Sequence, residues 1–252
     1  MASIAAWYDS DFYQGSERQR GQFYANYLAG EESRLRESRH RWHRDLAALL
    51  PGTGASVLEI GCATGSLLAT IRAAGHNVAG IDLSKRFAQA ARELHGLDVM
   101  VTDIADAPFG PASFDLVLLF GTLSNLHRLP ERLQQIHRWL KPGGHLVANF
   151  PAADSFTARL YGRHYWMFAP TVNTFLSTKG CRLALERADF VVTALQRDVQ
   201  QPGWSKLVTL ARLPLGDAAL RLLRLQRASM PWPLPAPGIR IVWARKPSED
   251  PA

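Results

Sequence analysis

Cysteine and long hydrophobic runs are scarce in this sequence of 252 residues. The two cysteines, Cys62 and Cys181, lie far apart and neither belongs to a Cys-x-x-Cys pair, which argues against a disulfide framework and a cysteine-based metal site. No run approaches the roughly 18 apolar residues that a bilayer-spanning helix needs. The first residues also lack the basic start and apolar stretch of a secretory signal. The sequence therefore predicts a cytoplasmic location, no transmembrane segment and two free thiols.

Basic residues outnumber acidic ones, with 29 Lys and Arg against 22 Asp and Glu and a formal net charge of +7. Such an excess is compatible with an acidic partner, for example nucleic acid, a carrier protein or an anionic membrane. An arginine-rich solvated surface produces the same charge, and we prefer that interpretation. The basic apolar stretch 220–227 leaves peripheral membrane contact open, although an amphipathic cap helix is the simpler account.

Short apolar segments alternate with amphipathic ones from residue 55 onward. Strands are expected at 57–60, 78–81, 99–102, 114–120 and 145–150, and helices at 66–74, 85–94 and 130–140. A helix at 178–188 and strands near 191–193 and 239–244 complete the pattern. This alternation predicts an α/β fold whose doubly wound, mainly parallel sheet carries helices on both faces.

Two further parts frame this alternation. Residues 1–54 are expected to form a small N-terminal cap, aromatic at first and then helical over 31–50, ahead of a main domain over 55–252. The main domain contains long interruptions near 151–177 and 202–238. Because compact domains keep most connections short, we expect these insertions to lie on the substrate side.

A turn of small residues follows the first expected strand. It reads Glu59-Ile60-Gly61-Cys62-Ala63-Thr64-Gly65, and a helix begins directly after it. Glycine lets the backbone turn tightly and approach a ligand, while the helix N-terminus presents N–H groups. This arrangement is typical of a nucleotide-type site. Ala63 stands where a dinucleotide-binding turn has its second glycine, which argues against NAD.

Two more acidic residues follow the next expected strands. Asp82 ends the second strand, about 20 residues after the turn, where a carboxylate can accept hydrogen bonds from ribose hydroxyls. Asp103 ends the third strand, where it can accept from an exocyclic amine. The carboxyl ends of parallel strands meet at one edge of a sheet, so these acids and Glu59 are expected to line one crevice. Loop carboxylates that cap helices are the alternative.

In these motifs the sequence resembles the class I S-adenosylmethionine-dependent methyltransferases, and within them a bacterial branch that acts on small molecules or glycans. The resemblance covers the first part of the main domain, and it rests in order on residues 57–65, 80–82, 103–104, 114–117 and 140–144. It implies a Rossmann-like, seven-stranded sheet with a reversed last strand, and S-adenosyl-L-methionine as the cofactor.

The resemblance also assigns cofactor contacts. Gly61 and Gly65 are expected near the methionine part of the cofactor. Asp82 is expected at the ribose, and Asp103 with Ile104 near the adenine. The full expected set is Glu59, Gly61, Cys62, Ala63, Gly65, Asp82, Leu83, Asp103, Ile104 and Phe120. At Ala63 the family most often has glycine, and the added methyl group is a mild change.

The segment after the fourth expected strand, residues 120–127, normally faces the transferred methyl group in this family. Here it lacks the Asn- or Asp-Pro-Pro-aromatic motif of nitrogen methylation and the Pro-Cys nucleophile of cytosine C5 enzymes, which argues against a nucleic-acid substrate. It also lacks acidic metal ligands, so no metal is expected. His127 is the candidate base, since histidine titrates near neutral pH. A loop histidine without a chemical role is the alternative.

An aromatic segment over residues 166–177 resembles a Trp…Pro-x-x-His…Phe-Ser pattern of the same bacterial branch. Asn173 stands at its histidine position, and asparagine orients a substrate but does not act as a base near neutral pH. Core aromatic residues under a lid are the alternative. The residues expected to contact the substrate are Tyr8, Tyr13, Asn125, Tyr165, Trp166 and Asn173.

These observations favour metal-independent methyl transfer to a small-molecule or saccharide acceptor, with oxygen slightly favoured as the acceptor atom and secondary metabolism as the context. An RNA-directed methyltransferase and a non-catalytic partner protein that binds the cofactor are the alternatives. The intact acids Glu59, Asp82 and Asp103 argue against a decayed enzyme, while Asn173 permits one. A monomer and a homodimer are both compatible with the sequence.

Overall fold

The computed structural model describes residues 27, 30–162, 165, 172–200 and 234–248. The chain divides into two compact units, one formed by residues 1–47 with 199–235 and the other by residues 48–198 with 236–252. The sequence expectation of a cap over 1–54 and a domain over 55–252 stays a prediction about the domains. None of the helices in the described part of the chain is long and apolar enough to cross a bilayer.

In the first unit, the described residues form helix α4 (Glu31–Arg41), which continues as a π-helical turn (Trp42–Leu46). A 3-10 turn, Ala47–Leu49, follows and leads into the second unit. Glu31 and Glu32 lie in the first turn of α4, and Arg39, His40 and Arg41 lie in its last turn, which suits the helix dipole. The expected helix over 31–50 therefore forms as three successive segments, first α-helical, then π-helical and then 3-10.

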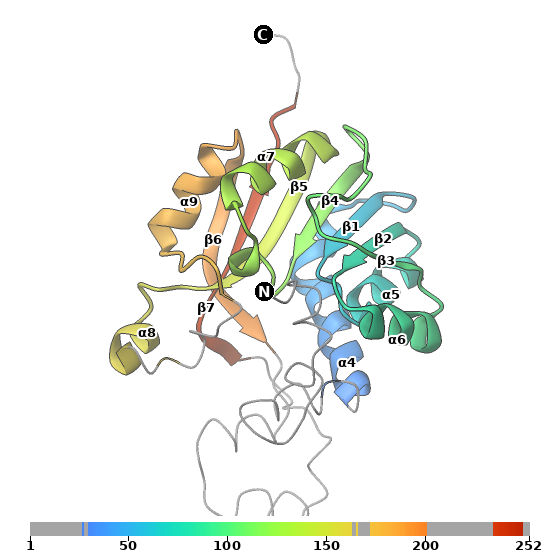
Figure 1. Ribbon diagram of the computed structural model, residues 1–252, viewed down its shortest axis with the longest axis horizontal. Helices are drawn as coiled ribbons and strands as arrows, with labels where there is room; N and C mark the ends of the chain where they lie inside the picture. Colours follow the sequence, from blue (N-terminus) through green and yellow to red (C-terminus); the bar gives the residue numbers. More distant parts are fainter. Residues whose placement is uncertain (1–26, 28–29, 163–164, 166–171, 201–233, 249–252) are drawn as a thin grey trace, which may run out of the picture. The chain divides into compact units, whose positions relative to one another are not determined.

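The second unit contains most of a seven-stranded sheet with the order β3-β2-β1-β4-β5-β7-β6 (Figure 1). The strands are β1 (Ser56–Ile60), β2 (Asn77–Asp82), β3 (Val99–Val101), β4 (Phe114–Leu119), β5 (Leu140–Pro151), β6 (Val191–Gln200) and β7 (Leu234–Arg245). The helices are α5 (Ser66–Ala73), α6 (Lys85–His95), α7 (Leu129–Trp139), α8 (Phe156–Tyr161) and α9 (Thr178–Glu186), with a 3-10 turn at Leu123–Asn125.

Strands β1 to β5 pair in parallel, and β7 pairs antiparallel to β5. The expected seven-stranded, mainly parallel sheet with a reversed last strand is therefore confirmed. Strands β2 and β3 lie on one side of β1, while β4 and β5 lie on the other. In open α/β sheets, such a reversal of strand order opens a crevice at the carboxyl ends of the two central strands. Here those strands are β1 and β4.

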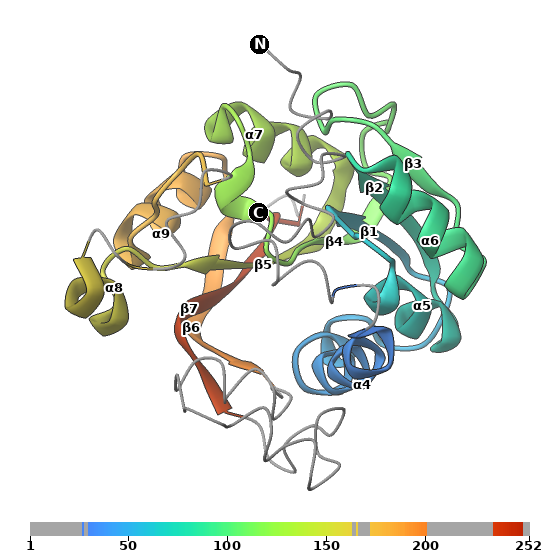
Figure 2. The same cartoon turned by 60° about the horizontal axis from the view of Figure 1, so that its bottom comes forward.

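Helices cover both faces of the sheet (Figures 1 and 2), as expected. Helices α5 and α6 pack on one face over a small apolar cluster formed by Cys62, Leu68, Ala91 and Leu97. Helices α7 and α9 pack on the other face over the main core, which includes Leu58, Ile60, Leu133, Ile136 and Leu185. Because alternate residues of a strand point to opposite faces, a short apolar strand such as β1 can contribute to both layers.

Helix α8 is the element that the sequence did not indicate. Ser155 caps its N-terminus by accepting a hydrogen bond from the Ala158 N–H. Its apolar residues Phe156, Leu160 and Tyr161 are exposed, at 79%, 66% and 46%. The helix therefore buries no continuous apolar face, and the sequence lacks the periodicity that would mark it.

The C-terminal end of α7 is bonded to the residue that follows β7, the last strand of the chain. Lys246, directly after β7, donates hydrogen bonds from Nζ to the carbonyl oxygens of His137 and Leu140, at 3.0 and 2.9 Å. A cation suits the negative end of a helix dipole. Burial and the nearby Lys246 charge lower the pKa of His137, and burial with the nearby Arg245 charge lowers the pKa of His145.

These two histidines predict a pH-dependent stability. The unfolded chain, in which the histidine pKa is about 6.5, takes up protons that the folded protein resists. The stability that depends on these two neutral histidines should therefore be complete above about pH 6.5. The free energy of unfolding should decrease as the pH falls through this value. Urea unfolding measured at about pH 7.5 and pH 5.5 checks this in the parent and in the double variant His137→Gln/His145→Gln. An equal decrease in both proteins would contradict the assignment.

Candidate cofactor and acceptor site

The turn after β1 has the tight backbone that its small residues predict. Gly61 and Gly65 have positive φ angles of 73° and 72°, and Ala63 has a φ of 48°. The Gly61 N–H donates to the carbonyl of Ile81 at 2.8 Å, and the Gly65 N–H donates to the carbonyl of Cys62 at 2.8 Å. Helix α5 begins directly after Gly65, so the N–H groups of its first turn lie at the carboxyl edge of the sheet.

Gly61 also permits a close approach between this turn and the loop that follows β4. A Cβ atom at Gly61 would lie 2.3 Å from Oγ1 of Thr122, well inside van der Waals contact. Any larger residue would push the two segments apart. The central pair of strands thus brings the turn and the loop after β4 together at one edge of the sheet.

Asp82 ties the turn to the end of β2. Its side chain is buried, and its two oxygens accept hydrogen bonds from the N–H groups of Ala63 and Ser84, both at 2.9 Å. An ionised carboxylate can accept about four hydrogen bonds, so these two bonds are compatible with donors from ribose hydroxyls. Glu59, two residues before Gly61, is a second buried carboxylate at the end of β1. Both acids therefore lie where the sequence predicted them.

Cys62 lies in the turn but cannot act as a nucleophile there. Burial raises the pKa of its thiol well above the usual value, and the charges of Glu59 and Asp82 raise it further. Burial likewise raises the pKa of Cys181 to about 12. Both cysteines are free, as expected. Since the thiolate is the reactive form, neither residue suits covalent chemistry near neutral pH.

The third expected acid lies beside the second. The Thr102 N–H donates to the carbonyl of Asp82 at 3.2 Å, which holds the end of β3 against the end of β2. Asp103 follows, and its Oδ1 accepts a hydrogen bond from the Ala105 N–H at 2.7 Å. Ile104 is buried. The carboxylate of Asp103 thus shapes a turn, and it remains partly exposed at this edge.

The loop after β4 is bonded to the segment before α9. The N–H groups of Asn173 and Thr174 donate to the carbonyl of Ser124, at 2.9 and 3.0 Å. The Asn173 Nδ2 donates to the carbonyl of Asn125 at 2.5 Å and lies 3.3 Å from Nε2 of His127. Asn125, His127 and Asn173 come from two distant parts of the sequence, and the structure brings all three together.

The geometry of this cluster selects one form of His127. The Asn173 amide nitrogen can only donate, so this contact requires the form of His127 in which Nε2 accepts. His127 and Asn173 are both exposed. A bond of 3.3 Å is long for an N–H···N contact and can be replaced by a hydroxyl of an incoming molecule.

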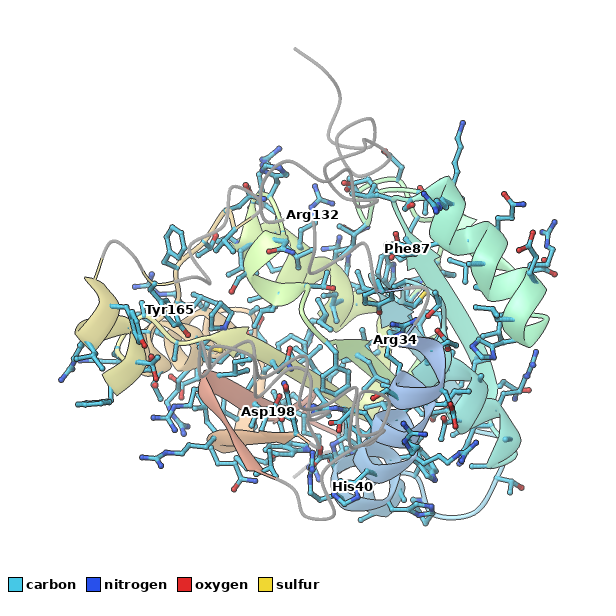
Figure 3. The ribbon with its side chains drawn as sticks, turned by 90° about the horizontal axis from the view of Figure 1, so that it is seen from below. Arg34, His40, Phe87, Arg132, Tyr165 and Asp198 are labelled. Carbon is cyan, nitrogen blue, oxygen red and sulfur yellow. The ribbon has the colours of Figure 1, made fainter. Side chains whose placement is uncertain are left out.

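Three of the expected substrate contacts, Tyr8, Tyr13 and Trp166, lie outside the described residues, as does the basic stretch 220–227. Tyr165 is 2% exposed, and a Cβ atom at Gly238 would lie 2.2 Å from its hydroxyl (Figure 3). This position gives Tyr165 a packing role, and its contact with substrate stays a prediction. Among the described residues, no three His, Cys, Asp or Glu side chains form a group that could hold a metal ion.

The sequence did not point to three residues that shape the site. Thr122 contacts the turn at Gly61, and the side chains of Asn149 and Asp198 form a buried hydrogen bond at 2.9 Å. Asn149 lies among the apolar residues of β5, so a polar residue inside a buried strand is the one available signal.

Comparison with known proteins identifies a family for the chain that carries this site. A model of a methyltransferase domain matches residues 34–195. A demethylmenaquinone methyltransferase of Tropheryma whipplei is 32% identical over 143 residues, which cover 54% of this chain and 59% of that protein. A ubiquinone biosynthesis O-methyltransferase of Paracidovorax citrulli is 29% identical, over 72% of this chain and 69% of that protein. The chain thus spans less than two thirds of the first of these relatives.

Solved structures support the fold. An S-adenosylmethionine-dependent methyltransferase from Archaeoglobus fulgidus superposes with a TM-score of 0.60 at 18% sequence identity, over 87% of this chain and 99% of that one. The family match, by contrast, includes the turn after β1, the acids after β2 and β3 and the loop after β4. Because it covers more than half of the chain, this protein belongs to the methyltransferase domain family, and its cofactor is S-adenosyl-L-methionine.

Proposed function

We propose that this protein transfers the methyl group of S-adenosyl-L-methionine to a hydroxyl oxygen of a small-molecule or saccharide acceptor, without a metal ion. One observation carries the proposal. His127 and Asn173 form an exposed polar pair on two segments that are bonded together, and one of these segments contacts the cofactor turn through Thr122. A candidate base and a candidate acceptor-binding group are thus held beside the expected cofactor site.

The residues at the carboxyl edge of the sheet fit this cofactor. The turn from Gly61 to Gly65 offers close backbone approach to its methionine part. The carboxylate of Asp82 suits the ribose hydroxyls, and Asp103 suits an exocyclic amine of adenine. The bound cofactor supplies an electrophilic methyl group, so the protein needs chiefly to align the acceptor and to exclude water.

His127 suits the removal of a proton from the acceptor. Its Nε2 carries the lone pair, and the Asn173 amide that now lies 3.3 Å away can turn to bind another polar atom of the acceptor. Oxygen is also the acceptor atom named for the relative in ubiquinone biosynthesis, which supports a hydroxyl acceptor here. The cytoplasmic location, the context of secondary metabolism, peripheral membrane contact and the state as monomer or homodimer stay predictions of the sequence.

Cofactor binding should depend on Asp82. Calorimetry is expected to show binding of S-adenosylmethionine and S-adenosylhomocysteine, and no NAD binding. Asp82→Ala should weaken S-adenosylhomocysteine binding by about 1.5–3 kcal/mol, because it removes charge-assisted hydrogen bonds to the ribose.

The control is Asp98→Ala, which removes an exposed carboxylate that pairs with Arg92 and should leave the affinity unchanged. Since Asp82 also bonds to Ala63 and Ser84, circular dichroism should establish that the variant is folded. An unchanged affinity in a folded Asp82→Ala protein would show that the ribose is bound elsewhere.

Methyl transfer should survive chelation of divalent metals, because the segment after β4 offers no acidic ligands. The test measures release of S-adenosylhomocysteine with and without EDTA, over a panel of phenols, saccharides and acyl carboxylates, together with an RNA transcript. Loss of turnover in EDTA that magnesium restores would refute metal independence. Turnover of the RNA alone would favour the RNA-directed alternative, and no turnover despite cofactor binding would favour the non-catalytic one.

The maximal rate should depend on His127. With an acceptor from this panel, His127→Ala should lower the maximal rate by about 100-fold or more with little change in cofactor affinity. Asn173→Ala should mainly raise the Michaelis constant of the acceptor, since it removes a positioning contact. His95→Ala, at the end of α6, is the matched control and should have no effect. A loss of less than about tenfold in His127→Ala would mean that the residue is not the base.

A further inference from the structure

A buried polar chain connects strand β6 to the loop after β4. Asn149 on β5 is 8% exposed and Asp198 on β6 is fully buried. Asn149 lies between the buried apolar residues Ala148 and Phe150. Burying polar groups away from water is costly unless they are hydrogen-bonded, so hydrogen-bond partners are required for these two side chains.

The arrangement joins two hydrogen bonds through a single amide. The Asn149 Nδ2 donates to Oδ2 of Asp198 at 2.9 Å, and the Asn149 Oδ1 accepts from the Gly121 N–H at 2.6 Å. Figure 3 labels Asp198 on its strand. The cross-strand partner of Asn149 is Ile241 of β7, and β7 lies between β5 and β6 in the sheet. The two hydrogen bonds therefore connect β6 to the end of β4 across β7 and β5.

The two hydrogen-bond partners of the Asn149 amide determine which way it faces. The two ends of an asparagine amide have nearly the same shape but opposite hydrogen-bonding character. The Gly121 N–H only donates, so the carbonyl oxygen of Asn149 must face it, and the NH2 group then faces the Asp198 carboxyl oxygen that accepts from it. The reversed amide would set its oxygen against the carboxylate and its NH2 group against the Gly121 N–H. Both contacts would be repulsive.

The oriented amide holds the first peptide group of a loop that carries the site. Gly121 has a positive φ of 73°, and its carbonyl oxygen accepts a hydrogen bond from Nδ2 of Asn125 at 3.2 Å. The next residue, Thr122, lies against the cofactor turn at Gly61. Gly121 is therefore held at its N–H by Asn149 and at its carbonyl oxygen by Asn125, directly before the segment that carries His127.

We propose that Asp198 is a positioning residue, which orients the Asn149 amide and thereby holds the start of the loop after β4 in place beside the cofactor turn. Asp198 acts through Asn149, and the proposal rests on the proposed function only for the consequence to methyl transfer. The proposal predicts that the asparagine and the aspartate can be exchanged between positions 149 and 198 while the loop stays in place. In the variant Asn149→Asp/Asp198→Asn, the carboxylate at position 149 accepts from both the Gly121 N–H and the amide at position 198.

The experiment measures amide hydrogen exchange by NMR in the full chain. The variants are Asp198→Ala, Asn149→Asp and the exchanged double variant, and the Gly61 amide, which donates to Ile81, is the internal control. In both single variants the Gly121 amide should exchange at least about tenfold faster than in the parent, relative to Gly61. In the double variant it should return to within about threefold of the parent.

The turnover number, measured with an acceptor from the panel, should follow the same order. It should fall in the single variants and recover in the exchanged variant, while binding of S-adenosylhomocysteine changes little. An equal acceleration of the Gly121 and Gly61 amides would show a general loss of stability and would overturn the proposal, as would a double variant that is no better than Asp198→Ala. A parent protein that fails to bind S-adenosylhomocysteine would overturn the proposed function, and the exchange at Gly121 would still decide the role of Asp198.

Discussion

The parallel pairing of β1 with β2 on one side and with β4 on the other determines where the candidate site residues lie. Parallel strands end at the same edge of the sheet, so this pairing alone brings together the turn after β1, the acid at the end of β2 and the loop after β4. The close contact between the turn after β1 and the loop after β4 depends on Gly61, because only a residue without a side chain allows the turn to approach Thr122. The hydrogen bonds of Asp82 then hold the turn in this position.

The sequence predicted this part of the molecule well, for physical reasons. Buried parallel strands are short apolar runs, and they are bounded by glycine turns and by helices with a clear apolar face. The signals at Glu59, Asp82 and Asp103 are local, since each acid lies within two residues of the end of its strand. The number of strands and the reversed last strand followed from the family resemblance, and the seven-stranded sheet with its antiparallel pairing of β7 with β5 confirmed them.

Other features depend on contacts that no local pattern encodes. Helix α8 buries no continuous apolar face, and the π-helical turn after α4 is a local change of hydrogen bonding within a helical segment, which apolar periodicity does not mark. The link between Asn149 and Asp198 joins strands that are neighbours of β7 and are far apart in sequence. The sequence marks Asn173 because it stands at the histidine position of the family pattern. Its contact with His127 joins residues 46 positions apart in sequence, so it depends on the fold.

The thiol of Cys62 has a consequence for how the protein withstands chemical stress. A cysteine beside a cofactor would usually be a point of attack for oxidants and alkylating agents, which react with the thiolate. Here the flanking carboxylates and the apolar layer beneath α5 and α6 keep that sulfur protonated and shielded. These carboxylates, which include the proposed ribose ligand Asp82, therefore also disfavour the reactive thiolate form of Cys62.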